Sequence, residues 1–230
     1  MPGTTIAERL ALVRQRVARA TERAGRSPAE VTIVAVSKSF PAQAIEEAAA
    51  AGIAHVGENR VQEAAAKIPA LRHLPLTWHM VGHLQTNKAK TALELFDIIQ
   101  SMDSLRLAEV LSRHAGRSIP VLLEVNVAGE ASKFGFSPQE VPLVAESIAR
   151  LPHLDVRGLT TVAPLVSDPE EVRPVFRELR RLRDALGLAE LSMGMSDDFE
   201  VAIEEGATMV RIGRAIFGER VHPERSRRDV

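Results

Sequence analysis

The stretch Val31-Thr32-Ile33-Val34-Ala35-Val36-Ser37-Lys38 decides the fold. It is a short run rich in β-branched residues, which is typical of a strand buried on both faces of a parallel sheet. The run ends in Lys38, at the carboxyl edge where such sheets place their active sites. Partial burial lowers the pKa of an amine and makes it a candidate nucleophile for Schiff-base chemistry. The alternative is a lysine whose ammonium group reaches water from the strand end.

Short apolar segments alternate with helical ones along the rest of the chain. Together with the first, strands are expected at residues 31–37, 53–57, 77–82, 97–101, 119–127, 155–162, 190–195 and 207–213. Between them, helix starts are indicated by Asn59 with Gln62, by Ser137 with Glu140, and by Asp168 with Glu171. Strict alternation over about eight units favours an α/β fold of the (β/α)8 TIM barrel type over an open doubly wound sheet.

An additional helix is predicted before the first strand, over residues 5–24. Thr5 and Glu8 have the spacing of a capping box, and apolar residues recur after them at helical spacing. We therefore expect a permanent helix packed on the core, not a transit peptide. The whole chain, 1–230, is expected to be one barrel domain, with a flexible tail over 219–230.

Composition excludes several classes of function. The chain has 230 residues, of which 29 are basic and 30 acidic, so no basic excess indicates nucleic-acid binding. The absence of cysteine excludes disulfides and thiolate metal sites, and suits a reducing cytosol. No apolar run is long enough for a membrane-spanning helix. Neither a GxGxxG nor a GxxxxGK[ST] motif is present, so dinucleotide and nucleoside-triphosphate sites lack their loops.

The last two predicted strands end in loops that suit phosphate, as the corresponding loops of many barrels do. One loop, Ser192-Met193-Gly194-Met195-Ser196-Asp197-Asp198, offers two hydroxyls and a glycine. Ser196 could bind a ligand, cap the following helix, or do both. The other is Arg211-Ile212-Gly213-Arg214, in which Arg211 falls inside a buried strand and needs a partner.

A closed barrel places its last strand beside its first, so Lys38, Arg211 and both loops would share one mouth. Pyridoxal 5'-phosphate needs this combination of an amine, anion donors and a group facing its ring nitrogen. A cofactor-free Schiff-base aldolase acting on a sugar phosphate is the alternative, and colour would distinguish the two.

Other polar residues carry weaker signals. His79 and His83 lie about 13 Å apart on an extended strand, too far for one ion, so no metal site is predicted. His83 either faces the cofactor ring or is a hydrogen-bonded structural histidine. Asn59 is either a ligand-side amide or the cap of the following helix. Glu124 and Asn126 share one face of the fifth strand and are expected to point inward.

The chain resembles the pyridoxal phosphate homeostasis protein family. The residues that carry the resemblance run in order along nearly the whole chain: Val36-Ser37-Lys38, Gly57-Glu58-Asn59, Trp78-His79-Met80-Val81-Gly82-His83-Leu84-Gln85, Arg157-Gly158-Leu159, Ser192 to Asp198, and Arg211-Ile212-Gly213. The resemblance implies a barrel like the N-terminal domain of alanine racemase. Two positions depart from the family pattern, with Arg60 where a tyrosine is frequent and Arg214 where a small residue, often threonine, is frequent.

The resemblance also implies residue roles. Lys38 would hold pyridoxal 5'-phosphate as a Schiff base, and Arg211 would face the pyridine nitrogen. The phosphate would lie among Ser192, Ser196, Gly213 and Arg214. The expected cofactor-binding set is completed by Asn59, His83, Met193 and Gly194, and no catalytic residue is predicted.

The expected function is reversible binding of the cofactor within intracellular vitamin B6 homeostasis, with little or no turnover. An arginine stays protonated and donates to the ring nitrogen, which makes the ring a weaker electron sink, and the chain contains no tyrosine to act as an acid or base. The alternative is a slow racemase-like enzyme that uses Lys38 as its base. We expect a cytoplasmic monomer whose partners are the small-molecule cofactor and, transiently, apo-enzymes that require it.

Overall fold

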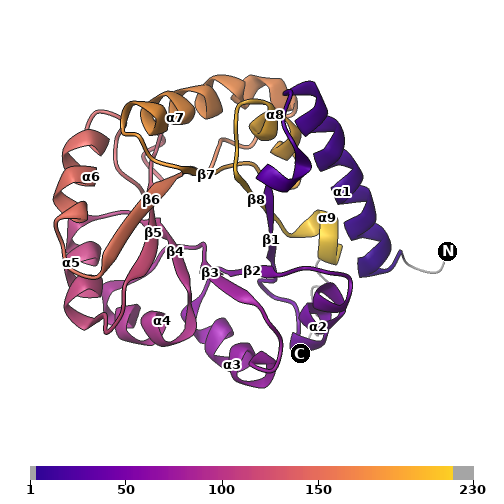
Figure 1. The fold of residues 1–230 in the computed structure, drawn as a ribbon, viewed down its shortest axis with the longest axis horizontal. Coiled ribbons are helices and arrows are strands. Elements are labelled where there is room, and N and C mark those ends of the chain that lie inside the picture. Colours follow the sequence, from indigo (N-terminus) through magenta and orange to yellow (C-terminus); the bar gives the residue numbers. More distant parts are fainter. Residues whose placement is uncertain (1–3, 220–230) are drawn as a thin grey trace, which may run out of the picture.

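The computed structural model describes residues 4–219, which form a closed barrel of parallel strands (Figure 1). The strands are β1 (Thr32–Val36), β2 (His55–Glu58), β3 (Thr77–Met80), β4 (Ile98–Met102), β5 (Ile119–Glu124), β6 (Leu154–Thr160), β7 (Glu190–Ser192) and β8 (Met209–Ile212). Each one falls within or beside a segment expected from the sequence. The predicted (β/α)8 barrel is therefore confirmed.

Helices surround the barrel and connect successive strands (Figure 1). The α-helices are α1 (Ile6–Arg23), α2 (Ala42–Ala50), α3 (Val61–Leu71), α4 (Ala89–Leu95), α5 (Leu105–His114), α6 (Val141–Ala149), α7 (Arg173–Ala185), α8 (Phe199–Glu204) and α9 (Arg214–Phe217). Short 3-10 helices are η1 (Pro28–Glu30), η2 (Thr86–Lys88) and η3 (Pro169–Val172).

The barrel closes where β8 pairs with β1. In this parallel pair Val34 lies opposite Arg211, and Ala35 lies opposite Ile212. Because neighbouring strands run in the same direction, their carboxyl ends meet at one rim. The closure therefore brings the segment after Val36 next to the segment after Ile212.

The apolar core has two parts. The larger one lies between the outer face of the barrel and the surrounding helices. The smaller one contains Val34, Leu122 and Met209 from three strands, whose side chains share the inner face of the barrel. Alternation along each strand explains the division, because successive side chains point to opposite faces of a sheet. Much of the remaining interior is filled by buried polar side chains, which form the floor of the site described below.

Helix α1 completes the outer ring at the seam between β8 and β1 (Figure 1). It begins with the predicted capping box, in which Thr5 and Glu8 each bond the other's backbone amide. Arg9 Nε donates to the carbonyl oxygen of Ile216 at 2.6 Å, which ties α1 to α9. Since α9 is only 4 residues long, α1 covers the position that a full last helix would occupy.

One predicted strand is shorter than expected. The segment 119–127 leaves the barrel after Glu124, because the chain returns and pairs with itself. The Asn126 amide donates to the Phe136 carbonyl at 2.9 Å, and the Phe136 amide donates to the Glu124 carbonyl at 2.8 Å. The Asn126 side chain holds this loop by accepting from the Glu130 amide, so it does not point inward as predicted.

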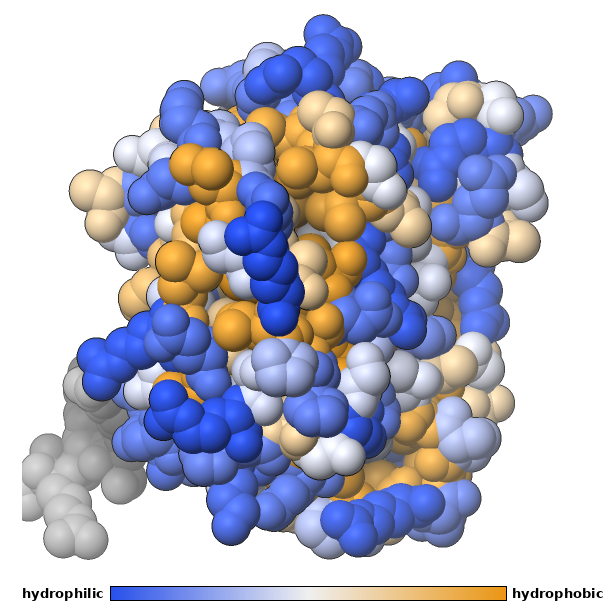
Figure 2. All heavy atoms as spheres, turned by 60° about the vertical axis from the view of Figure 1, so that its left-hand side comes forward, coloured by the Kyte–Doolittle hydropathy of each residue, from blue (hydrophilic) through white to orange (hydrophobic). Residues whose placement is uncertain are grey.

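The face shown in Figure 2 carries hydrophilic side chains with apolar patches between them. Exposed large apolar side chains include Leu143 on α6 and Leu165 in the loop after β6. None of the described helices combines the length and apolarity needed to cross a membrane. Of the predicted flexible tail, Glu219 is exposed and residues 220–230 lie outside the described part of the chain.

Candidate functional site

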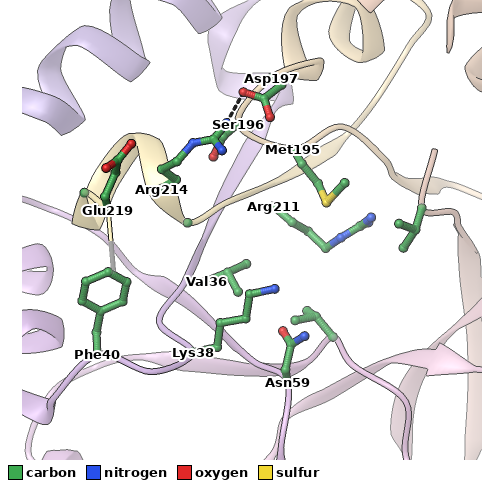
Figure 3. Close-up of a pocket in the computed structure, with 14 residues that line it drawn as sticks. Val36, Lys38, Phe40, Asn59, Met195, Ser196, Asp197, Arg211, Arg214 and Glu219 are labelled. Carbon is green, nitrogen blue, oxygen red and sulfur yellow. Dashed lines mark hydrogen bonds and ion pairs between the residues drawn. The ribbon is translucent and has the colours of Figure 1, made fainter. Parts of the chain in front are cut away.

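A cavity of about 590 Å³ opens at the carboxyl ends of the strands (Figure 3). Its volume is in the range of sites that hold small ligands and cofactors. The lining residues come from the ends of β1, β2, β3, β6, β7 and β8: Val36, Lys38, Phe40, Asn59, Val81, Val162, Met195, Ser196, Asp197, Arg211, Gly213, Arg214, Gly218 and Glu219.

Lys38 enters the cavity from the turn that follows β1. Its side chain extends between Val36 and Asn59 and toward Arg211 (Figure 3). The residue is half-buried, as expected for a lysine that follows the carboxyl end of a barrel strand. Val36 precedes it by two positions and shares its face, which explains why both line the cavity.

The turn around Lys38 is fixed on both sides. Ser37 donates its hydroxyl to Glu58 Oε1 at 2.6 Å, and its amide donates to the Gly57 carbonyl at 3.0 Å. Ser39 has a φ of 68°, in the left-handed region, and its amide donates to Glu63 Oε2 at 2.9 Å. A non-glycine residue in this region is held there by its surroundings. The backbone of Lys38 is therefore clamped between two anchored serines.

Arg211 forms part of the cavity floor and is almost completely buried. Its Nη1 donates to Ser192 Oγ at 2.7 Å and to Thr160 Oγ1 at 2.9 Å, and its Nη2 donates to the Thr161 carbonyl at 2.7 Å. The partner that the sequence required is thus a set of hydroxyls and carbonyls. Because these acceptors are neutral, they satisfy donors on Nη1 and Nη2 of the guanidinium and leave its positive charge in place.

Two carboxyl groups lie farther from this charge. Burial lowers the pKa of Arg211, while attraction from Glu124 and Asp198 partly opposes that effect. Burial also raises the pKa of Glu124 and of Asp198, and Arg211 counteracts the rise at both. Glu124 faces the barrel interior, as predicted. The surroundings of Arg211 therefore combine one buried cation with two carboxyl groups whose ionisation is made less favourable by burial.

The opposite side of the cavity is formed where β8 leads into α9. A Cβ added to Gly213 would lie 3.1 Å from the Val36 carbonyl oxygen, so a glycine keeps this edge narrow. Ser196 Oγ accepts from the Ala215 amide at 3.3 Å. Arg214 forms an ion pair with Asp197 at the rim (Figure 3). A hydroxyl, a glycine backbone and a guanidinium together suit an anionic group.

The structure brings six of the ten predicted site residues to this cavity: Lys38, Asn59, Ser196, Arg211, Gly213 and Arg214. It does not bring the other four. Ser192 and Met193 are fully buried, and Ser192 lies against Arg211 below the cavity. Gly194 has a φ of 91°, and a Cβ there would lie 2.6 Å from Ala202 Cβ. These residues shape and support the floor.

His83 lies outside the cavity and has structural partners. Its Nδ1 lies 2.6 Å from Asp103 Oδ2, and its ring stacks on Phe134 with centroids 3.8 Å apart. It lines a second cavity of about 630 Å³, which also includes Asn59. Of the two alternatives that the sequence left open, this structure therefore shows His83 as a hydrogen-bonded structural histidine.

The helix starts indicated at Asn59 and Ser137, and the cap that Ser196 could have formed, are wrong. The N-cap of α6 is Glu140 and not Ser137, because the helix begins at Val141. The N-cap of α3 is Arg60 and not Asn59, because the helix begins at Val61. The N-cap of α8 is Asp198 and not Ser196. Asn59 and Ser196 therefore have side chains available at the cavity, where both are lining residues.

Sequence reasoning missed the apolar walls and the polar residues below the floor. Phe40 stacks on Phe217 with ring centroids 5.1 Å apart, and closes the side of the cavity below α9. Gln100 on β4 and Thr160 on β6 are buried polar residues of the barrel. Gln100 and Ser101 interrupt the apolar strand Ile98–Met102, and this interruption was the signal that could have identified Gln100.

The chain matches the family model described as alanine racemase, N-terminal domain, over residues 9–221. It is 46% identical over 222 residues to a protein of Pseudomonas aeruginosa called pyridoxal phosphate homeostasis protein, covering 94% of this chain and 96% of that protein. The protein of the same name from Escherichia coli K12 is 43% identical over 230 residues, covering 94% of this chain and 97% of that protein.

Solved structures agree with this relationship. PipY of Synechococcus elongatus PCC7942, with PLP bound, is 43% identical with a TM-score of 0.83, covering 93% of this chain and 100% of that chain. Alanine racemase from Corynebacterium glutamicum is 21% identical with a TM-score of 0.68, covering 91% of this chain and 62% of that chain, and shares the fold. The chain therefore belongs to the pyridoxal phosphate homeostasis protein family, built on the barrel of the alanine racemase N-terminal domain.

Proposed function

We propose that this protein binds pyridoxal 5'-phosphate reversibly through Lys38 and serves to buffer or deliver the cofactor, with little or no turnover. The observation that carries the proposal is the convergence of Lys38, Arg211 and Gly213 on one cavity of about 590 Å³. An amine, a buried guanidinium and an anion-suited edge fit the aldehyde, the ring nitrogen and the phosphate of this molecule. PipY, a relative with 43% identity, has been solved with PLP bound.

Each group has a distinct role in the proposal. When bound, pyridoxal phosphate supplies an aldehyde that condenses reversibly with a primary amine, and Lys38 offers that amine. Arg211, on the cavity floor, would donate a hydrogen bond to the ring nitrogen. Ser196 and Arg214 would hold the phosphate together with the backbone at Gly213, where an added Cβ would lie 3.1 Å from the Val36 carbonyl oxygen.

The same groups argue against efficient catalysis. A guanidinium stays protonated and donates its hydrogen bond without giving up a proton, so it withdraws few electrons from the ring. Chemistry on an amino acid would also need an acid or base opposite Lys38, and the chain contains no tyrosine for that role. We therefore propose a cofactor carrier, and treat racemisation of small amino acids as the competing function.

An absorbance spectrum before and after borohydride reduction tests this function. Purified protein incubated with pyridoxal phosphate should turn yellow, lose its visible band on reduction, and carry the label on the peptide that contains Lys38. Lys38→Arg keeps the positive charge but removes the primary amine, so it should stay colourless. Labelling of another lysine would overturn the proposal, and so would lysine-dependent racemisation at ordinary enzyme rates of about 1 s⁻¹ or more.

The proposal extends to partners and location. Delivery requires transient contact with apo-enzymes that need the cofactor, and we place this exchange in the cytoplasm, where a chain without cysteine is suited to reducing conditions. A monomer leaves the mouth of the barrel accessible for such contacts. Sedimentation with and without the cofactor would test that state, and a stable dimer in both conditions would contradict it.

A further inference from the structure

A chain of buried hydrogen bonds crosses the barrel interior and ends at Arg211. Arg211 Nη1 donates to Ser192 Oγ at 2.7 Å, and the Ser192 hydroxyl lies 2.6 Å from Gln100 Oε1. Gln100 Nε2 lies 2.8 Å from His79 Nδ1, and His79 Nε2 lies 3.0 Å from His55 Nδ1. His55 is the first residue of β2, at the opposite end of the barrel from the cavity, and is half-buried.

The direction of every proton in this chain follows from its Arg211 end. A guanidinium can only donate, so Ser192 Oγ accepts from Arg211. The Ser192 hydroxyl proton then has one acceptor among the described residues, Gln100 Oε1. This fixes the orientation of the Gln100 amide, whose nitrogen must donate to His79 Nδ1. His79 therefore carries its proton on Nε2 and donates it to His55 Nδ1.

The electrostatics of the histidines agree with this direction. Burial and, to a smaller extent, the nearby His55 together lower the pKa of His79 to about 3. Burial lowers the pKa of His55 as well. Both rings are therefore neutral at physiological pH, and a neutral ring can accept at one nitrogen while it donates at the other. No proton has to be added or removed to complete the chain.

We propose that Gln100 is a positioning residue that aims Arg211 at the cavity, and that His79 fixes the orientation of Gln100. This inference rests on the proposed function, because Arg211 is the group assigned to the cofactor ring. The contacts with Ser192, Thr160 and Thr161 engage Nη1 and one N–H of Nη2. The second N–H of Nη2 and the Nε–H remain as donors, in a side chain that lines the cavity.

Gln100 suits this role because it is a neutral amide. A carboxylate in its place would bring a negative charge within one residue of the guanidinium and would favour a proton on His79 Nδ1. An apolar side chain would leave the Ser192 hydroxyl and His79 Nδ1 without partners in a buried place, and Ser192 could then rotate away from Arg211. With an apolar side chain at position 100, the guanidinium would therefore lose one of its two fixed hydroxyl acceptors.

The ligand-free protein gives the first test, by nitrogen-15 NMR. We expect His79 to show a protonated Nε2 and an unprotonated Nδ1, and the Arg211 side-chain N–H signals to exchange slowly with water. Gln100→Leu should shift the Arg211 signals and speed their exchange. Ser101→Ala is the matched control, because Ser101 is the next residue on β4, is equally buried, and its hydroxyl has no hydrogen-bond partner among the described residues.

The second test measures the protein with pyridoxal phosphate bound. Gln100→Leu should shift the visible absorption maximum and weaken binding by about tenfold, the scale on which outer partners of metal ligands act. Ser192→Ala removes one oxygen and is the safer variant if Gln100→Leu fails to fold. It should produce the same spectral shift, and Ser192→Thr should restore the wild-type spectrum. The double variant should lose no more than either single variant, because both break one chain.

These outcomes separate the inference from the proposed function. If wild-type protein fails to bind pyridoxal phosphate at Lys38, the function is wrong, while the ligand-free NMR still tests the chain. Suppose instead that the cofactor binds, but that Gln100→Leu or Ser192→Ala changes the Arg211 signals and the absorption maximum no more than the control Ser101→Ala. The positioning role of Gln100 is then overturned. A His79 proton found on Nδ1 in the wild type would also overturn it.

Discussion

Lys67 Nζ lies 2.7 Å from Glu58 Oε1, directly beneath the turn that carries Lys38. The Glu58 side chain is fully buried and that of Lys67 is 12% exposed, so the pair is largely removed from water. Lys67 also donates to the Ser37 carbonyl at 3.0 Å. The two residues thus join the end of β2 and helix α3 to the backbone immediately before Lys38.

Removing Lys67 should destabilise the protein strongly, because it would leave the Glu58 carboxylate buried and unpaired. We expect Lys67→Met to lower the free energy of unfolding by about 3 kcal/mol in a urea titration, with an unchanged slope. The double variant with Glu58→Gln should recover much of that loss. A single variant within about 1 kcal/mol of the wild type would show that the pair is not an important anchor of the turn.

Gly158 should tolerate no side chain. A Cβ at this position would lie 2.0 Å from the Glu190 carbonyl oxygen, where β6 meets β7. We expect Gly158→Ala to lower the free energy of unfolding by about 2 kcal/mol or more, because one strand must shift. Gly116→Ala is the control, since a Cβ there meets nothing within 4 Å, and it should change stability by less than about 0.5 kcal/mol. Equal effects would contradict the close approach of the two strands.

Stability should fall in mild acid because of His79. Its pKa in the folded state is about 3, against an ordinary value of 6.5, so below pH 6.5 the unfolded chain takes up a proton that the folded protein refuses. Above pH 6.5, His79 is neutral in both the folded and the unfolded state and costs no stability. As the pH falls below 6.5 the free energy of unfolding decreases, and the decrease due to His79 levels off near pH 3. By pH 5 the loss should reach about 2 kcal/mol.

Urea titrations between pH 7.5 and 5 would measure this decline. His79→Gln should flatten the dependence of stability on pH, whatever its effect on stability at pH 7.5. His114→Gln changes an exposed histidine on α5 and should leave the dependence as in the wild type. If His79→Gln retained the full decline, the buried neutral histidine would not be its cause.

The negative charge of the native Asp197 side chain should weaken the binding of a phosphate group, because this carboxylate lines the cavity and pairs with Arg214. We expect Asp197→Asn to tighten binding of pyridoxal phosphate about twofold at low salt, a modest gain because both side chains of the pair are 57% exposed. Pyridoxal, which lacks the phosphate, should bind unchanged, and high salt should abolish the gain. Asp184→Asn, on α7, serves as a charge control; a similar gain for pyridoxal would contradict this interpretation.

The fold could be predicted from the sequence because short apolar segments alternate with helix signals along the chain. Lys38 and Arg211 stood out for a related reason, since each is a cation at or inside such a segment. The helix starts at Asn59 and Ser196 were misplaced by one or two residues, since a polar side chain near a helix start resembles a cap wherever it points. That small shift changes both residues from caps into cavity residues.

The floor of the site could not be predicted in the same way. Ser192 was expected at the phosphate because its loop contains hydroxyls and a glycine. Its position against Gln100 depends on how β4 and β7 face each other across the interior, and these strands are separated by 92 residues in the sequence at the contacting side chains. Alternation shows which face of a strand a residue occupies, but not which residue it meets across a barrel.

The hydrogen bond from Arg9 to Ile216 spans 207 residues and has a consequence for synthesis. Helix α1 leaves the ribosome before all the barrel strands, but the groups on α8 and α9 that it covers are translated after β7. During most of translation the buried face of α1, with Leu10 and Val17, lacks its final neighbours and must remain in water or be shielded by a chaperone. Barrel closure must therefore wait until β8 has been translated, and a ribosome stalled before β8 should carry a nascent chain that proteases cut readily.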